Sequence, residues 1–267
     1  MTDDNATPKR AIDPDLARRL HRALTAGSEE LHGVLQDPAM EVLRGALKNR
    51  NLGEEHLLAL LKRRDLSEEL LKAVYQLEMS RQSHRLQLAL VRNPGTPGPV
   101  VLPLLPHLHL FELVDLCYFP GITPDQKFAA ERAILQRLPT TELGNKLTVA
   151  RRATATVVGE MLKDGDPRLV EICLTNPHLR EVAILQFLNG PAANAETISI
   201  IGRQQKWQTR PNLRMAMLKN PRTAEVWFVQ FLPGMRTPDV RNLLASRRLN
   251  PRQKKLVEEE LQKRSKG

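Results

Sequence analysis

The chain has 267 residues, of which 41% are AVILMFWYC residues and only 4% are aromatic. β-Sandwiches and β-barrels are usually rich in aromatic and β-branched residues, so this composition disfavours those folds and favours helices. No stretch approaches the roughly 20 apolar residues of a membrane span, and the first residues lack a signal peptide's cationic and apolar regions. Only two cysteines are present, Cys117 and Cys173, so we expect core thiols, a reducing compartment and a cytoplasmic location.

Helix start signals follow one another along the chain after residues 1–12, which we predict to be a flexible N-terminus. Each signal combines a residue that can cap a helix with a following Pro or with acids that suit the first turn. In chain order the signals are Asp13-Pro14, Ser28-Glu29-Glu30, Gly53-Glu54-Glu55, Ser67-Glu68-Glu69, Thr123-Pro124, Thr140-Thr141-Glu142, Asn194 and Asn250-Pro251. No convincing strand remains, so the sequence predicts an all-α fold of short helices.

The chain is a tandem duplication with an offset of 127 residues. About two dozen identities connect residues 15–139 with residues 142–266 in one ungapped register. Among them, Asn49 falls on Asn176 and Asn93 falls on Asn220. We therefore predict a first helical-repeat half over residues 13–139 and a second half over residues 140–267.

A shorter period lies within each half, because Asn49 and Asn93 are 44 residues apart, as are Asn176 and Asn220. This spacing is typical of solenoid repeats of two or three helices. In the turn Asn220-Pro221-x-Thr223, proline biases Asn220 away from helical dihedrals. We expect Thr223 to be the N-cap of the next helix, with Glu225 in its first turn.

The segment from Asn220 to Lys255 combines this turn with an apolar run ending in Leu-Pro and the motif Leu-x-Pro-x-x-x-Lys. A weaker copy runs from Asn93 to Lys127. The combination resembles a group of largely uncharacterised bacterial proteins with HEAT-like or variant leucine-rich helical repeats. The resemblance implies a right-handed α-solenoid of HEAT-like repeats, and it supplies no catalytic residues.

Positive charge is concentrated near the C-terminus. The net charge is +10, and residues 201–267 hold 16 Lys or Arg against five Asp or Glu. The matching residues 74–140 hold six basic and five acidic residues, so the same scaffold does not require the extra charge. Self-repulsion of that excess would be relieved by an acidic partner. The predicted partner-binding residues are Arg203, Lys206, Trp207, Arg210, Arg214, Lys219, Arg222, Arg241 and Arg248.

Several partners remain open for this basic half. An acidic protein face, nucleic acid and anionic lipid headgroups would all be attracted, and we favour another protein, with a near-neutral first half that is structural or protein-binding. No sequence-specific nucleic-acid motif is present, so nucleic acid would be bound through its phosphates. Trp227 aligns with Val100 on an apolar face and is expected in the core. Trp207 aligns with Ser80, which leaves packing and partner contact equally open.

The sequence offers no catalytic, metal or cofactor motif, and we expect a non-enzymatic binding module. His107 and His109 are two residues apart, which places them on different faces of a helix, so they are interpreted as turn residues. One enzyme class is kept as an alternative, because some HEAT-like solenoids are DNA glycosylases that bind DNA in a basic groove with tryptophans and a carboxylate. That alternative rests on analogy of fold alone. The oligomeric state is not predicted.

Overall fold

The computed structural model describes residues 13–266, and every regular element in that range is a helix. Twenty α-helices and four 3-10 helices are present among these residues, which confirms the prediction of an all-α fold. The predicted flexible segment 1–12 lies outside the described residues. None of the described helices has both the length and the apolar character that crossing a membrane would require.

The chain divides into two compact units between Ala133 and Ile134, inside α10 (Pro124–Arg137). The boundary expected from the sequence, after residue 139, falls slightly later, within the 3-10 helix η2 (Leu138–Thr140). The other elements of the first unit are α1 (Pro14–Thr25), α2 (Ser28–Val34), α3 (Met40–Ala46), α4 (Glu54–Leu60), α5 (Glu68–Gln76), α6 (Glu78–Gln82), α7 (His84–Arg92), α8 (Gly98–Leu104), η1 (Leu105–His107) and α9 (Leu110–Leu116). The other elements of the second unit are α11 (Leu143–Arg152), α12 (Ala155–Met161), η3 (Leu162–Asp164), α13 (Pro167–Thr175), α14 (Glu181–Asn189), α15 (Ala195–Arg203), α16 (Gln205–Gln208), α17 (Pro211–Lys219), α18 (Glu225–Phe231), η4 (Leu232–Gly234), α19 (Thr237–Leu244) and α20 (Pro251–Lys266).

Helix bounds in the two units recur at the offset seen in the sequence. Helices α2, α5, α7, α8 and η1 of the first unit have the same lengths as α12, α15, α17, α18 and η4, and they begin 127 residues earlier. Several predicted start signals mark helix starts: Asp13 and Ser67 are N-caps whose side chains accept backbone N–H groups, and Asn194 does the same in the second unit. The duplication is therefore visible in local structure as well as in identities.

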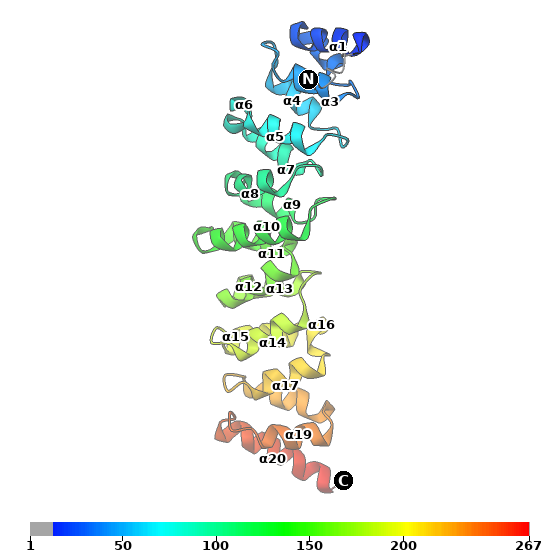
Figure 1. Ribbon diagram of the computed structural model, residues 1–267. Helices are drawn as coiled ribbons and strands as arrows, with labels where there is room; N and C mark the ends of the chain where they lie inside the picture. The colour runs from blue at the N-terminus through cyan, green and yellow to red at the C-terminus, as the bar shows by residue number, and fades with distance from the viewer. Residues whose placement is uncertain (1–12, 267) are drawn as a thin grey trace, which may run out of the picture. The chain divides into compact units, whose positions relative to one another are not determined.

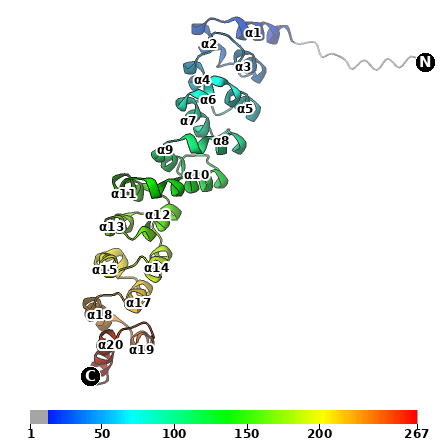
Figure 2. The same cartoon turned by 90° about the vertical axis from the view of Figure 1, so that its left-hand side faces the viewer.

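Helices two or three places apart along the chain pack against each other within each unit (Figures 1 and 2). In the first unit α1 contacts α3 and α3 contacts α5, while α2 contacts α4 and α4 contacts α7. The corresponding helices of the second unit make the same four contacts. Each of these helices therefore packs on helices before and after it in the chain, and buried apolar residues occur throughout both units.

A buried asparagine lies at or just after the end of one helix of each repeat and joins it to the repeat before. Asn49 and Asn176 are 5% and 1% exposed. The Asn176 Nδ2 donates to the carbonyl oxygens of Ala150 at 2.6 Å and Ala153 at 3.0 Å, and its Oδ1 accepts the backbone N–H of His178 at 2.7 Å. The Asn49 Nδ2 donates in the same way to the carbonyl oxygens of Ala23 and Ala26, the equivalent residues of the first unit.

The same arrangement occurs 44 residues later. The Asn93 Nδ2 donates to the carbonyl oxygens of Leu61 and Arg63, and the Asn220 Nδ2 donates to that of Leu188. Both residues are C-caps in extended conformation, as the proline after each of them predicts. Carbonyls at helix ends have no partner within the helix, so these side-chain donors satisfy groups that would otherwise be buried unpaired.

The threonine of this turn has a different role from the predicted one. The N-cap of α18 is Ala224, which offers no side-chain oxygen, so the prediction that Thr223 caps this helix is wrong. The Thr223 hydroxyl instead donates to the carbonyl oxygen of Met217 at 2.5 Å, and that of Thr96 donates to Leu90 at 2.6 Å. Thr223 and Thr96 therefore bond to carbonyl oxygens of the helix that precedes the turn, and they do not cap the helix that follows it. Glu225 lies in the first turn of α18, as expected.

One turn of the first unit depends on a glycine. Gly121 has φ +93°, in the left-handed region that side chains disfavour, and a Cβ built there would lie 2.8 Å from the Cβ of Pro94. Arg248 stands at the equivalent position of the second unit, where no described residue other than glycine has positive φ. The two units therefore differ in backbone at this turn.

We expect Asn176→Ala to lower the free energy of unfolding by about 2–4 kcal/mol, because it leaves two buried carbonyls and one N–H without partners. Urea unfolding followed by circular dichroism measures the change. Asn145 is exposed on α11, so Asn145→Ala is the matched control and should alter stability by less than about 0.5 kcal/mol. Equal effects of the two substitutions would contradict the structural role of Asn176.

Candidate functional site

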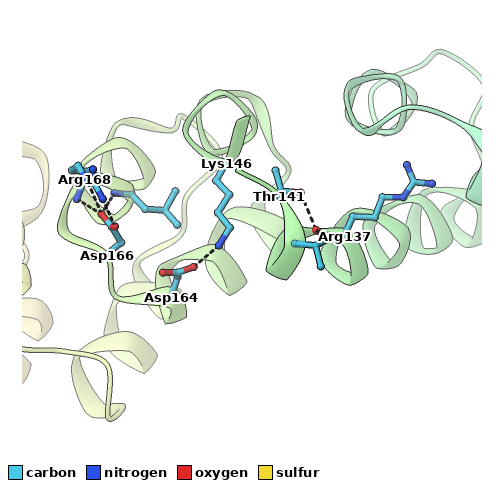
Figure 3. Close-up of polar contacts among 8 residues, drawn as sticks. Arg137, Thr141, Lys146, Asp164, Asp166 and Arg168 are labelled. Atoms are coloured by element: carbon cyan, nitrogen blue, oxygen red, sulfur yellow. Dashed lines mark hydrogen bonds and ion pairs between the residues drawn. The ribbon is translucent and has the colours of Figure 1, made fainter. Parts of the chain in front are cut away.

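Charges at the start of the second unit are paired with one another (Figure 3). The Lys146 Nζ lies 2.9 Å from the carboxylate of Asp164, and an Nη2 to Oδ2 distance of 2.9 Å joins Arg168 to Asp166. The Arg168 guanidinium is the main reason why the pKa of Asp166 is lowered. This part of the unit is therefore close to electrostatically balanced.

The predicted basic residues further along lack such partners. In the described range 201–266, ion pairs join Arg236 to Asp239 and Arg264 to Glu260. None of the eight predicted partner-binding Lys or Arg residues forms an ion pair within that range. Arg203, Lys206, Arg210, Arg222, Arg241 and Arg248 are exposed, whereas Arg214 and Lys219 are half-buried.

Arg214 and Arg222 donate to backbone carbonyl groups, which makes them part of the fold. The Arg214 Nε donates to the carbonyl oxygen of Gln208, and its guanidinium carbon lies 5.6 Å from the centre of the Phe231 ring. The Arg222 Nη1 donates to the carbonyl oxygens of Pro191 and Ala193, both at 2.7 Å. Arg214 is therefore not a free cation, and Arg222 offers only its remaining N–H groups.

The predicted residues do not gather in a single groove. Arg210 and Arg214 are at the N-terminal end of α17, whereas Lys219 ends this helix and Arg222 lies in the turn after it. Nine helical residues span about 13 Å, which is longer than one guanidinium can bridge. The predicted basic residues around α17 therefore form two separate groups within the second unit.

The structure brings Arg222 and Arg248 together at a hollow beside Asn220, which we call the Asn220 hollow. Its volume is about 360 Å³, and Arg248 also lies 3.5 Å from the Oδ1 of Asn189. The hollow is lined by Leu188, Asn189, Gly190, Pro191, Asn220, Pro221, Arg222 and Arg248. Arg203, Arg210 and Arg241 do not line it.

An equivalent hollow in the first unit, the Asn93 hollow, was not predicted. Its volume is about 520 Å³. It is lined by Glu55, Leu58, Leu61, Lys62, Arg64, Arg85, Leu88, Ala89, Arg92, Asn93, Pro94, Phe119 and Pro120. Arg85 is paired with Glu54 and Glu55, at 3.3 and 2.9 Å. Lys62, Arg64 and Arg92 are exposed and form no ion pair among the described residues.

Both tryptophans are buried. Trp207 is 3% exposed, and its Nε1 donates to the carbonyl oxygen of Leu174 at 3.0 Å, so its inclusion among the partner-binding residues is corrected. Lys206 covers its ring, with Nζ 4.4 Å from the centroid. Trp227 is 6% exposed, as predicted for a core residue, and its ring reaches the space above Gly202 that a side chain would fill.

Three polar residues, His84, His109 and Glu112, meet between the start of α7 and the start of α9. The His84 Nε2 lies 3.0 and 2.9 Å from the two carboxylate oxygens of Glu112, and the backbone N–H of His109 donates to Glu112 at 2.7 Å. Burial raises the pKa of Glu112, but the hydrogen bonds from His84 and from the His109 backbone outweigh it, so the net shift is downward. His84 and Glu112 are 28 residues apart, which local motif spacing does not detect.

The cysteines are core residues, as expected. Burial is the main cause that raises the pKa of both Cys117 and Cys173 to about 12. Comparison of the chain with models of protein families, with curated proteins and with solved structures finds no match. The resemblance to bacterial HEAT-like repeat proteins therefore stays a prediction.

We expect Arg222→Ala to lower the free energy of unfolding by about 1 kcal/mol, because two carbonyl acceptors lose a charged donor near the surface. Arg203 makes no such bond, and Arg203→Ala, the matched control, should change stability by less than about 0.5 kcal/mol. Thermal unfolding of both variants at one salt concentration measures the difference. An effect of Arg203→Ala as large as that of Arg222→Ala would refute the distinction between structural and free arginines.

We also expect both thiols to resist alkylation in the folded protein at pH 8, because a pKa of about 12 leaves almost no thiolate at that pH. Iodoacetamide labelling followed by mass spectrometry measures the modification, and the urea-unfolded chain is the positive control. Rapid labelling of either cysteine without urea would contradict their placement in the core.

Proposed function

We propose that the chain is a non-enzymatic docking module, built as a right-handed α-solenoid of HEAT-like repeats, that binds acidic segments of another protein. The observation that carries this proposal is the pair of equivalent hollows beside Asn93 and Asn220, each bordered by cations that have no acidic partner among the described residues. Helices that pack on their second neighbours within each unit support the solenoid.

The lining of the Asn93 hollow favours a protein over a nucleic acid. Leu58, Leu88 and Phe119 offer half-buried apolar surface, which an apolar side chain can cover. The ammonium of Lys62 and the guanidinium groups of Arg64 and Arg92 can bind carboxylates around it. A short segment that combines acidic residues with Leu or Phe is the occupant whose chemistry fits both parts.

The Asn220 hollow is smaller and more polar, so it suits a carboxylate without an adjoining large apolar group. Arg222 keeps N–H donors beyond the two carbonyl bonds of its Nη1, and Arg248 adds a second guanidinium. The exposed Arg203, Arg210 and Arg241 outside the hollow would raise the rate of association with an acidic partner.

The glycosylase alternative and DNA binding have less support. The two tryptophans that could have stacked on a base are both buried. The cationic surface alone would attract phosphates as well as carboxylates, so nucleic acid remains an outcome that the experiment must distinguish.

Fluorescence anisotropy with a labelled peptide of alternating Glu-Leu and Glu-Phe pairs tests the proposal, with a 20-nucleotide DNA duplex as the competing ligand. We expect the peptide to bind the native chain near physiological salt. Arg64→Glu/Arg92→Glu should weaken binding by about tenfold or more, because each attraction becomes a repulsion. Arg222→Glu/Arg248→Glu should weaken the binding of a poly-Glu peptide similarly.

A matched double reversal outside the lining of the hollow controls for net charge. Arg18→Glu/Arg81→Glu changes the net charge of the first unit by the same amount, at exposed positions that do not line the Asn93 hollow. It should leave peptide affinity within about twofold. Equal loss in both double variants, or binding of DNA but not peptide at physiological salt, would overturn the proposal.

A further inference from the structure

His84, His109 and Glu112 form a compact group of potential metal ligands in the first unit. One ring nitrogen of each histidine and one carboxylate oxygen of Glu112 lie within 4.8 Å of one another. The ring centroids of His84 and His109 are 4.4 Å apart, with the planes tilted by 42°. The His84 side chain is 36% exposed, that of Glu112 is 19% exposed, and His109 is exposed, so an ion in solution could reach them.

The arrangement suits a first-row divalent cation. Imidazole nitrogen and carboxylate oxygen bind zinc at about 2.0–2.2 Å, so two ligands on one ion are about 3.3 Å apart. The His84 Nε2 and the Glu112 oxygens already lie at 2.9 to 3.0 Å. His109 is exposed at the N-cap of α9, and one of its ring nitrogens already lies within 4.8 Å of the ligand atoms of the other two residues.

The second unit shows that the fold does not need this chemistry. The residues at the equivalent positions are Pro211, Arg236 and Asp239. There the carboxylate pairs with an arginine, the Arg236 Nε lying 2.9 Å from Asp239, in the first turn of α19. An arginine and a proline cannot ligate a metal, yet the same helix start forms. Two imidazoles are therefore not required to begin this helix.

We propose that His84, His109 and Glu112 are a binding site for Zn²⁺ or a similar divalent ion such as Ni²⁺ or Cu²⁺. Two imidazoles and one carboxylate are the ligand types that select these ions over Mg²⁺. Three protein ligands leave a fourth position for water or for a group of a bound partner. The metal would join the start of α7 to the start of α9 within the first unit.

Isothermal titration of the untagged full chain with ZnCl₂ tests the site, with MgCl₂ as the hard-ion control. We expect one zinc ion to bind per chain and magnesium not to bind measurably. His109→Arg, which inserts the residue found at the equivalent position of the second unit, should weaken zinc binding at least tenfold, as should His84→Ala. Circular dichroism of the metal-free variants verifies that they remain folded.

His32 provides the matched control. Its ring lies 4.6 Å from that of His56, so it belongs to a second histidine pair, but this pair belongs to no candidate metal group among the described residues. His32→Ala should leave zinc affinity unchanged. Electron paramagnetic resonance of the Cu²⁺-loaded chain adds a direct readout, because nitrogen ligands split the copper signal. The splitting should indicate two imidazole ligands in the native chain and one in His109→Arg. Zinc affinity unaffected by His84→Ala and His109→Arg, or lowered equally by His32→Ala, would overturn the site.

Discussion

The hydrogen bonds of four buried asparagines determine how one repeat meets the next. Asn93, Asn176 and Asn220 each leave the helical conformation as the C-cap of a helix, and Asn49 lies in the turn after α3. From these positions the side chains reach carbonyl oxygens of the preceding repeat. Those carbonyls have no partner in their own helix, and burial makes an unpaired carbonyl costly. The amide has two donors and one acceptor, so it fixes both the turn that it begins and the register of the neighbouring repeat. The two hollows lie beside Asn93 and Asn220, and the turns that begin at these residues contribute to their lining.

Arginine contributes to the same task, which changes the meaning of the positive charge. Arg63 donates to the carbonyl oxygens of Leu35 and Asp37, and Arg264 donates to those of Leu232 and Met235. Arg222 makes the corresponding bonds in the middle of the second unit. A guanidinium can bond two carbonyls at once, so part of the basic excess holds turns together. Net charge over a window of sequence therefore overstates how many cations are available to a partner.

The sequence predicted the elements better than the sites. Helix starts at Asp13, Ser67 and Asn194 follow from local capping chemistry, and the burial of Trp227 follows from its alignment with Val100. Trp207 could not be placed, because its partner, the carbonyl of Leu174, is 33 residues away in the chain. The Asn93 hollow could not be predicted for a similar reason. The sequence around Lys62, Arg64 and Arg92 also contains acids, and only the structure shows that Glu55 pairs with Arg85 and not with these three cations. The meeting of His84 with Glu112 likewise depends on how repeats stack, which residue spacing alone does not reveal.

Gly121 and Arg248 show how duplicated units diverge. In the first unit the chain turns through a left-handed glycine against Pro94, and any side chain there would collide with the proline ring. In the second unit the turn abandoned that conformation, and an arginine occupies the position. The two units thus differ here in main-chain path as well as in side chain, so an exchange of single residues between the copies would not convert one hollow into the other. After a duplication, backbone geometry can limit which copy is open to a new ligand chemistry.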